Sequence, residues 1–117
     1  MRKLKILLVV SSLFLFSSFI KNDINTKHIA TWYDMSGRIS ASGVRMSRDS
    51  ATAAYNAAPF GTKLMVTNLK NNKTCIVTVT DRMELKSPNH IDLSYKAFGL
   101  IENHRTGKIS VKIKIIE

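Results

Sequence analysis

The 117-residue chain has one cysteine, two prolines and few aromatic residues, which make up 8% of it. The lone Cys75 excludes an internal disulfide, so the fold must depend on its hydrophobic core. Cys75 alternates with Val77 and Val79, and this pattern favours a small buried side chain over a reactive thiol. The three histidines lie far apart among polar residues. Because they lack the paired spacing of metal ligands, we expect no metal or other cofactor.

Acidic residues are also scarce, since eight of them stand against eighteen lysines and arginines, a formal charge of +10. The hydrophobic share of 44% is ordinary, so the composition indicates one globular domain rather than a disordered chain. A basic surface attracts acidic polymers such as cell-wall glycan with its peptide carboxylates, anionic lipid or nucleic acid. A surface that is merely well solvated is at least as good an interpretation as a specific docking patch.

The first twenty residues have the layout of a secretory signal. Three basic residues precede fifteen uncharged residues from Ile6 to Ile20, and this apolar run is short for a membrane span. We predict a signal peptide over residues 1–20, with an uncleaved membrane anchor as the alternative because no Ala-x-Ala site follows. Both place the domain in the periplasm, the envelope or the medium, where nucleic acid is the least favoured partner. No cysteine follows the run, so a lipid anchor is not expected.

Residues 21–28 are expected to be a flexible N-terminal segment, and alternation of apolar and polar residues predicts strands in the rest of the chain. Residues 109–115 alternate with a period of two, which is typical of a strand with one buried face. Residues 64–69 and 74–80 are two β-rich runs joined by a four-residue polar loop, which predicts a hairpin. In the second run the threonines, Thr80 included, are expected to face away from the core. A further strand is expected over residues 29–33.

Helical signal is weak in this chain. Ser94 is placed as an N-cap before a short helix, in which Ala97, Leu100 and Ile101 fall on one face. The alanine-rich residues 49–58 favour a second helical turn, which the following proline and glycine would end. Several short strands with one or two small helices predict a closed, compact β-barrel, which leaves no open sheet edge.

Short segments in a fixed order carry a family resemblance. They are Ala30-Thr31-Trp32-Tyr33, Ser40-Ala41-Ser42-Gly43, Thr52-Ala53-Ala54-Tyr55, Pro59-Phe60-Gly61-Thr62, Val66-Thr67-Asn68-Leu69, Val79-Thr80-Asp81-Arg82 and Ile91-Asp92-Leu93-Ser94. Together they resemble the RlpA-like (rare lipoprotein A) family of double-psi β-barrel domains. The resemblance implies a mainly β fold over residues 29–117, a six-stranded double-psi β-barrel with one or two short helices, whose loops meet over an open groove.

The resemblance also implies an activity. Proteins similar to this one bind peptidoglycan glycan strands in the bacterial envelope, and some cut them as endolytic lytic transglycosylases. In such a reaction one carboxyl group protonates the leaving oxygen and then, as a base, helps the sugar's own primary hydroxyl close an anhydro ring. Asp81 corresponds to the Asp of the family's Asp-Arg-Gly-Pro segment and is the expected catalytic residue. From residue type alone, an aspartate that caps the following turn, with Arg82 as a surface partner, is the better interpretation. The family match reverses this preference.

Five residues are candidates for substrate binding. Trp32 and Tyr33 adjoin the expected groove; one of them stacks on a sugar ring while its neighbour enters the core, or both serve packing. Tyr55 retains a hydrogen-bonding hydroxyl, and Arg82 adjoins the catalytic position. Asp92 is interpreted first as an acceptor at the helix entry and second as a groove residue.

Departures from the family pattern leave three functional interpretations. Many members carry Glu where this chain has Val44, His where it has Tyr55, and Gly-Pro where it has Met83-Glu84. The first interpretation, which we favour because the acid itself is retained, is an exported lytic transglycosylase acting through Asp81. The second is a barrel that binds glycan without cleaving it, and the third is expansin-like loosening of the wall. We expect peptidoglycan strands as the partner, a monomer, and an envelope or divisome protein as a further candidate partner.

Overall fold

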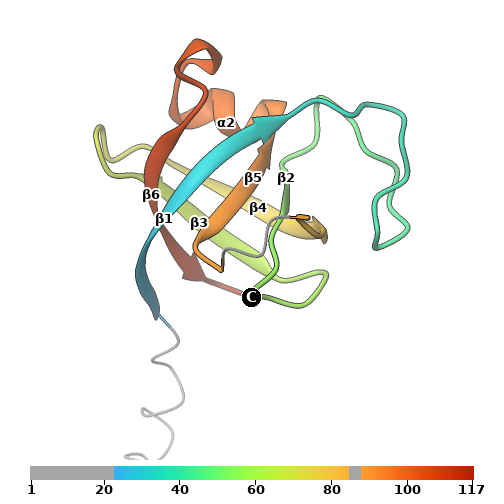
Figure 1. The fold of residues 1–117 in the computed structure, drawn as a ribbon, viewed down its shortest axis with the longest axis horizontal. Coiled ribbons are helices and arrows are strands. Elements are labelled where there is room, and N and C mark those ends of the chain that lie inside the picture. The colour runs from blue at the N-terminus through green and yellow to red at the C-terminus, as the bar shows by residue number, and fades with distance from the viewer. Residues whose placement is uncertain (1–22, 85–87) are drawn as a thin grey trace, which may run out of the picture.

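The computed structural model describes residues 23–84 and 88–117, in which six strands close into a barrel (Figure 1). The elements are β1 (Asp23–Tyr33), β2 (Thr52–Ala54), β3 (Lys63–Asn68), β4 (Thr74–Asp81), β5 (His90–Ser94), α2 (Tyr95–Ile101), the 3₁₀ turn η1 (His104–Thr106) and β6 (Ile109–Ile115). The predicted signal peptide over residues 1–20 lies outside the described residues. Within the described part of the chain, no helix has the length and apolarity to cross a membrane.

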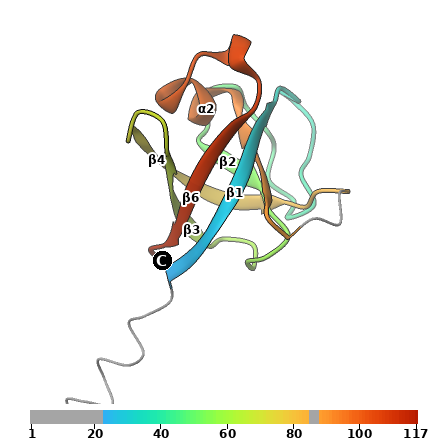
Figure 2. The same ribbon diagram turned by 60° about the vertical axis from the view of Figure 1, so that its left-hand side comes forward.

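The strands follow the order β1-β5-β2-β4-β3-β6 around the barrel. The β1–β5 and β2–β4 pairs are parallel, and the other pairs are antiparallel. Figure 2 shows β1 and β6 running side by side along one flank. The predicted hairpin is the β3–β4 pair. The expectation of a mainly β, six-stranded barrel is therefore confirmed.

The core fills the barrel with one face of each strand, as the period-two patterns predict. Inward side chains from β3 to β6 are at most 1% exposed: Leu64, Val66, Val77, Val79, Ile91, Leu93, Val111 and Ile113. Each such side chain contributes about 1.5–3 kcal/mol by leaving water. Cys75 is 4% exposed and belongs to this core, which confirms its predicted burial.

β1 begins at Asp23, six residues before the expected start of this strand. Asp23 pairs with Lys114, and His28 pairs with Val111 on β6. The expected flexible segment over residues 21–28 therefore differs from the structure from Asp23 onward. These residues show no apolar alternation, so their extended form follows from pairing with the edge of β6 rather than from a pattern of their own.

The short helix is confirmed, but it is rotated from its predicted orientation. The Ser94 hydroxyl accepts a hydrogen bond from the Ala97 N–H at 3.3 Å, as an N-cap does. The buried face consists of Ala97, Phe98 and Ile101, whereas Leu100 is 52% exposed. Rotation toward the large ring of Phe98 buries more apolar surface than the predicted face.

The second helical turn predicted over residues 49–58 is wrong. Residues 52–54 instead form β2, between β4 and β5 in the barrel. Ala53 is fully buried and Ala54 is 6% exposed. The helical preference of alanine is weak compared with tertiary pairing, and the small side chains let β2 sit between two neighbouring strands.

The register between β2 and β4 shifts just before Asp81, at the end of β4. Ala53 pairs with Val79 and Ala54 with Asp81, so Thr80 is an extra residue on β4. Val79 and Thr80 are both buried, and the prediction that Thr80 faces outward is therefore wrong. A bulge of this kind re-aims the next side chain, and here it turns Asp81 out of the core alternation.

Candidate functional site

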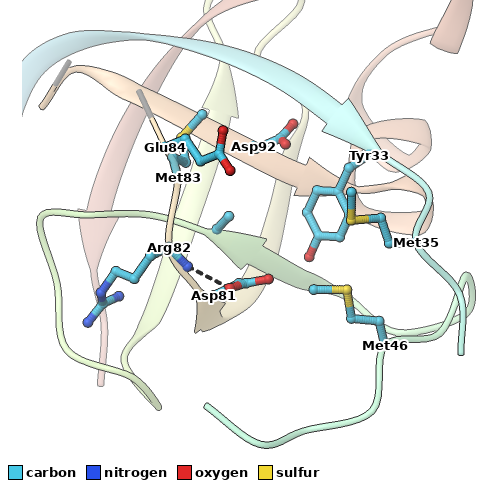
Figure 3. Close-up of a pocket in the computed structure, with 9 residues that line it drawn as sticks. Tyr33, Met35, Met46, Asp81, Arg82, Met83, Glu84 and Asp92 are labelled. Carbon is cyan, nitrogen blue, oxygen red and sulfur yellow. Dashed lines mark hydrogen bonds between the residues drawn. The ribbon is translucent and has the colours of Figure 1, made fainter. Parts of the chain in front are cut away.

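A cleft of about 510 Å³ is lined by residues of β1, β2, β4 and β5, of the loop between β1 and β2, and of the segment that follows β4 (Figure 3). Its lining residues are Tyr33, Met35, Met46, Ala54, Asp81, Arg82, Met83, Glu84 and Asp92. Four of the six predicted site residues are among them. The cleft combines an apolar wall of three methionines with three carboxyl groups, and this mixture suits the apolar faces and hydroxyl groups of a sugar chain.

Asp81 ends β4 and points into the cleft (Figure 3). Its Oδ1 accepts hydrogen bonds from the backbone N–H of Ala41 at 3.2 Å and of Arg82 at 2.9 Å. Among the described residues no hydrogen bond reaches Oδ2. The carboxyl group is therefore fixed through one oxygen while the other remains available to a ligand.

The Arg82 guanidinium turns away from Asp81 in Figure 3. Its Nη1 donates to the Tyr55 carbonyl at 2.8 Å, and its Cζ lies 4.0 Å from the centre of the Phe60 ring. No ion pair between Asp81 and Arg82 is found in the described part of the chain. The Asp81 side chain caps the backbone N–H of Arg82, as the turn interpretation predicts, but the predicted surface partnership between the two side chains is wrong.

Asp92 enters the cleft from β5 (Figure 3). Its Oδ1 accepts a hydrogen bond of 2.9 Å from the Thr31 hydroxyl, which also lies 3.0 Å from Nε2 of His90. Burial raises the pKa of Asp92 above its ordinary value, while the Thr31 bond and the charge of His90 act against this rise. Its partner is thus on β1, and the interpretation of Asp92 as an acceptor at the helix entry is wrong.

Tyr33 and Trp32 point to different regions, as alternation along β1 requires. Tyr33 lines the cleft with its hydroxyl 3.0 Å from the Thr52 hydroxyl. Burial raises the pKa of Tyr33, and the nearby Asp92 and Asp81 raise it further. Tyr33 therefore enters the cleft as a neutral phenol at physiological pH.

Trp32 lies outside the cleft. Its indole N–H donates to the His104 carbonyl at 3.0 Å, and its ring meets those of Tyr95 and His104 edge-on. It packs against the hydrophobic core. Of the two aromatic candidates for sugar stacking, only Tyr33 is therefore placed in the cleft.

Tyr55 is not part of the cleft either. Its side chain is fully buried, with the hydroxyl 2.9 Å from Nε2 of His28. It contributes to the site only through its backbone, because its carbonyl accepts from Arg82 and its N–H donates to the Asp81 carbonyl at 3.0 Å. The Tyr55 side chain therefore lies in the core and not in the cleft, where its expected role in substrate binding would place it.

Met35 and Met46 are cleft residues that sequence reasoning missed. Both lie in the loop between β1 and β2, where Arg48 pairs with Asp34 at 3.0 Å and covers the ring of Tyr95 at 3.9 Å. A long loop has no periodic pattern in the sequence. Its contacts, which include one to a residue distant in the chain, are therefore visible only in the folded structure. In residues 23–84 and 88–117, no group of three His, Cys, Asp or Glu side chains is arranged to hold a metal ion.

Comparisons with known proteins agree with the fold. A model of the lytic transglycolase family matches residues 25–113. A relative from Aquifex aeolicus, named a probable endolytic peptidoglycan transglycosylase RlpA, is 40% identical over 89 residues, which cover 74% of this chain and 39% of the relative. A relative of the same name from Synechocystis is 37% identical over 91 residues, which cover 76% of this chain and 28% of the relative. This chain spans well under half the length of these two relatives.

A solved structure shares the barrel. The apo form of an expansin from Clavibacter michiganensis has a TM-score of 0.67 and 26% identity to this chain, covering 79% of it and 50% of the expansin. The resemblance to RlpA-like proteins and the double-psi β-barrel fold are both confirmed. The family model covers nearly all of the described barrel, and we conclude that this chain belongs to the lytic transglycolase family.

Proposed function

We propose that this protein binds peptidoglycan glycan strands in the cell envelope and cleaves them as an endolytic lytic transglycosylase. The observation that carries the proposal is the placement of Asp81. It stands in a cleft of about 510 Å³, held by two backbone N–H groups, with no guanidinium against it. The relatives named as peptidoglycan transglycosylases support the substrate class.

The chemistry needs a carboxyl group that gives and then recovers a proton. The bond between the muramic acid sugar and the next glucosamine breaks as the leaving oxygen takes a proton. The primary hydroxyl of the muramic acid sugar then attacks the freed carbon and loses its own proton to a carboxylate, and no water is consumed. Asp81 is the first candidate for this acid–base role, because its free oxygen faces the cleft.

Tyr33 supports the proposal as a sugar-binding side chain. Its ring lines the cleft and offers a flat apolar face, and its neutral hydroxyl is a hydrogen-bond donor or acceptor. The net positive charge of the chain favours approach to the acidic wall polymer. We propose that residues 1–20 direct export and that the barrel acts as a monomer.

A second candidate function is glycan binding or wall loosening without cleavage. Val44, half exposed, stands where many RlpA-like proteins carry Glu, and Tyr55, buried in the barrel, stands where many carry His. These positions therefore supply neither a carboxylate nor an imidazole to the cleft. The likeness to an expansin barrel fits the same alternative.

One incubation separates the candidates. The full-length protein, kept soluble in mild detergent, is mixed with purified peptidoglycan sacculi, and the soluble products are analysed by mass spectrometry. We expect anhydro-muramic ends, together with pelleting of the protein with the sacculi. Pelleting without anhydro products would support the binding interpretation. The absence of both pelleting and anhydro products would contradict both interpretations.

A further inference from the structure

Two carboxyl-bearing residues flank one alanine at the centre of the cleft. Ala54 on β2 pairs with Asp81 on β4 and with Asp92 on β5. Because neighbouring strands lie about 4.8 Å apart, the backbones of Asp81 and Asp92 are about 10 Å apart. Both side chains line the cleft, and the small Ala54 between them leaves the space above it open.

The two carboxyl groups have different environments. Oδ1 of Asp81 accepts hydrogen bonds from two backbone N–H groups. Asp92 is half-buried, and its Oδ1 accepts one hydrogen bond, from the neutral hydroxyl of Thr31. Burial raises the pKa of Asp92. A pair of carboxyl groups in contrasting environments is the usual arrangement for an acid and a base with separate tasks.

We propose that Asp92 is a second catalytic residue, which donates the proton to the leaving oxygen while Asp81 acts as the base. This inference rests on the transglycosylase function proposed above and divides between two groups what one group was assigned there. Carboxyl groups that share one proton lie about 3 Å apart. Residues on strands two apart are placed instead to act on two different atoms of the sugar.

Each step balances. The bond from the anomeric carbon of the muramic acid sugar to the glucosamine oxygen breaks, and its electron pair stays on that oxygen, which takes the proton of Asp92. The primary hydroxyl oxygen of the muramic acid sugar bonds to the anomeric carbon, and its proton passes to Asp81. A final proton transfer from Asp81 to Asp92 through solvent restores the starting state, and no other reactant is needed.

Thr31 and His90 position Asp92. The Thr31 hydroxyl has a single proton, which it donates to Asp92 Oδ1. It can therefore only accept from His90, whose Nε2 must carry a hydrogen for the 3.0 Å contact. This chain of two hydrogen bonds links β1 to β5 and fixes the orientation of the Asp92 carboxyl group.

The charge around Asp92 comes from several elements. Besides His90 on its own strand, the titratable groups that line the cleft with it are Tyr33 from β1, Asp81 from β4 and Glu84 after β4. The Arg82 guanidinium is directed to the Tyr55 carbonyl and the Phe60 ring instead. β2 contributes only Thr and Ala residues. Loss of the Thr31 hydrogen bond removes one of the two influences that lower the pKa of Asp92.

The test compares Asp92→Asn with a matched carboxyl-to-amide control, Asp49→Asn, an exposed residue outside the cleft. The readouts are the rate of anhydro-product release from sacculi and pelleting with them, with folding followed by circular dichroism. We expect Asp92→Asn to lower the rate about 100-fold or more while pelleting persists, and Asp49→Asn to match the wild type. A folded Asp92→Asn variant that retains the wild-type rate would overturn the inference and leave the proposed function standing. A wild-type protein without anhydro products would overturn the proposed function itself.

A second pair of variants keeps the test decisive if Asp92→Asn does not fold. Thr31→Val removes the hydroxyl, whereas Thr31→Ser keeps it. Because the acid must be protonated to act, a higher pKa of Asp92 moves the alkaline limb of the pH–rate profile to higher pH. We expect that shift in Thr31→Val and not in Thr31→Ser. Equal loss of rate at every pH in Thr31→Val would show a purely structural role and would contradict the assignment of Asp92.

Discussion

The Tyr55 hydroxyl lies 2.9 Å from Nε2 of His28, inside the barrel. This contact joins the segment after β2 to β1 across the core, and it takes the Tyr55 side chain away from the cleft. The ring centres of the two residues are 5.7 Å apart. A position that the family resemblance assigned to the groove thus serves the stability of the barrel.

The first prediction concerns that hydroxyl. Tyr55→Phe removes one partner of a buried hydrogen bond, so we expect the free energy of unfolding to fall by about 1–3 kcal/mol. Chemical denaturation measures the loss, and sacculus pelleting is expected to stay at the wild-type level. Loss of pelleting without loss of stability would show that Tyr55 contacts the glycan after all.

The second prediction tests the inner face of β6. Ile113 is 1% exposed, and its neighbour Lys114 is exposed. Ile113→Ala is expected to destabilise the protein by about 2–5 kcal/mol because it leaves a cavity, and Lys114→Ala by less than about 0.5 kcal/mol. Both values come from urea unfolding. Equal effects of the two substitutions would contradict the assigned faces of the strand.

The third prediction concerns Cys75. Burial raises the pKa of its thiol to about 12, so almost none of it is thiolate at pH 8. We expect iodoacetamide to leave the native protein unmodified over a time in which urea-unfolded protein reacts completely, as mass spectrometry can show. Rapid alkylation of the native protein would place the thiol at the surface.

The fourth prediction is a pH dependence of stability at Asp92. Because burial raises its pKa in the folded state, the folded protein binds more protons than the unfolded chain just above the unfolded pKa. Stability therefore falls as pH rises through the interval from the unfolded to the folded pKa. Asp92→Asn removes this penalty, so its unfolding midpoint relative to wild type should be higher at pH 7 than at pH 3. A difference that does not change with pH would contradict the direction of the shift.

Much of the barrel is encoded in local patterns. The alternation over residues 109–115 and the polar loop after residue 69 predict β6 and the β3–β4 hairpin, and Ser94 predicts the start of α2. These features depend on neighbours in the sequence, so the sequence is enough to find them. Asp81 is predicted by its family segment rather than by a local pattern.

The rest depends on contacts that the sequence does not display. β2 formed where alanines favoured a helix, because β4 and β5 leave a place between them for small side chains. The extra residue Thr80 turns Asp81 outward, and it is visible only in the register with β2. The sequence indicates Asp92 as a candidate, but its hydrogen bond with Thr31 joins two strands that lie far apart in the sequence.

The most direct measurement of the central claim is the release of anhydro-muropeptides from sacculi by wild-type protein and by Asp81→Asn, with Asp49→Asn as the control. We expect the wild type and the control to release these products, and Asp81→Asn to release them about 100-fold more slowly or not at all while it still pellets with the sacculi. An unchanged rate in Asp81→Asn would contradict the account.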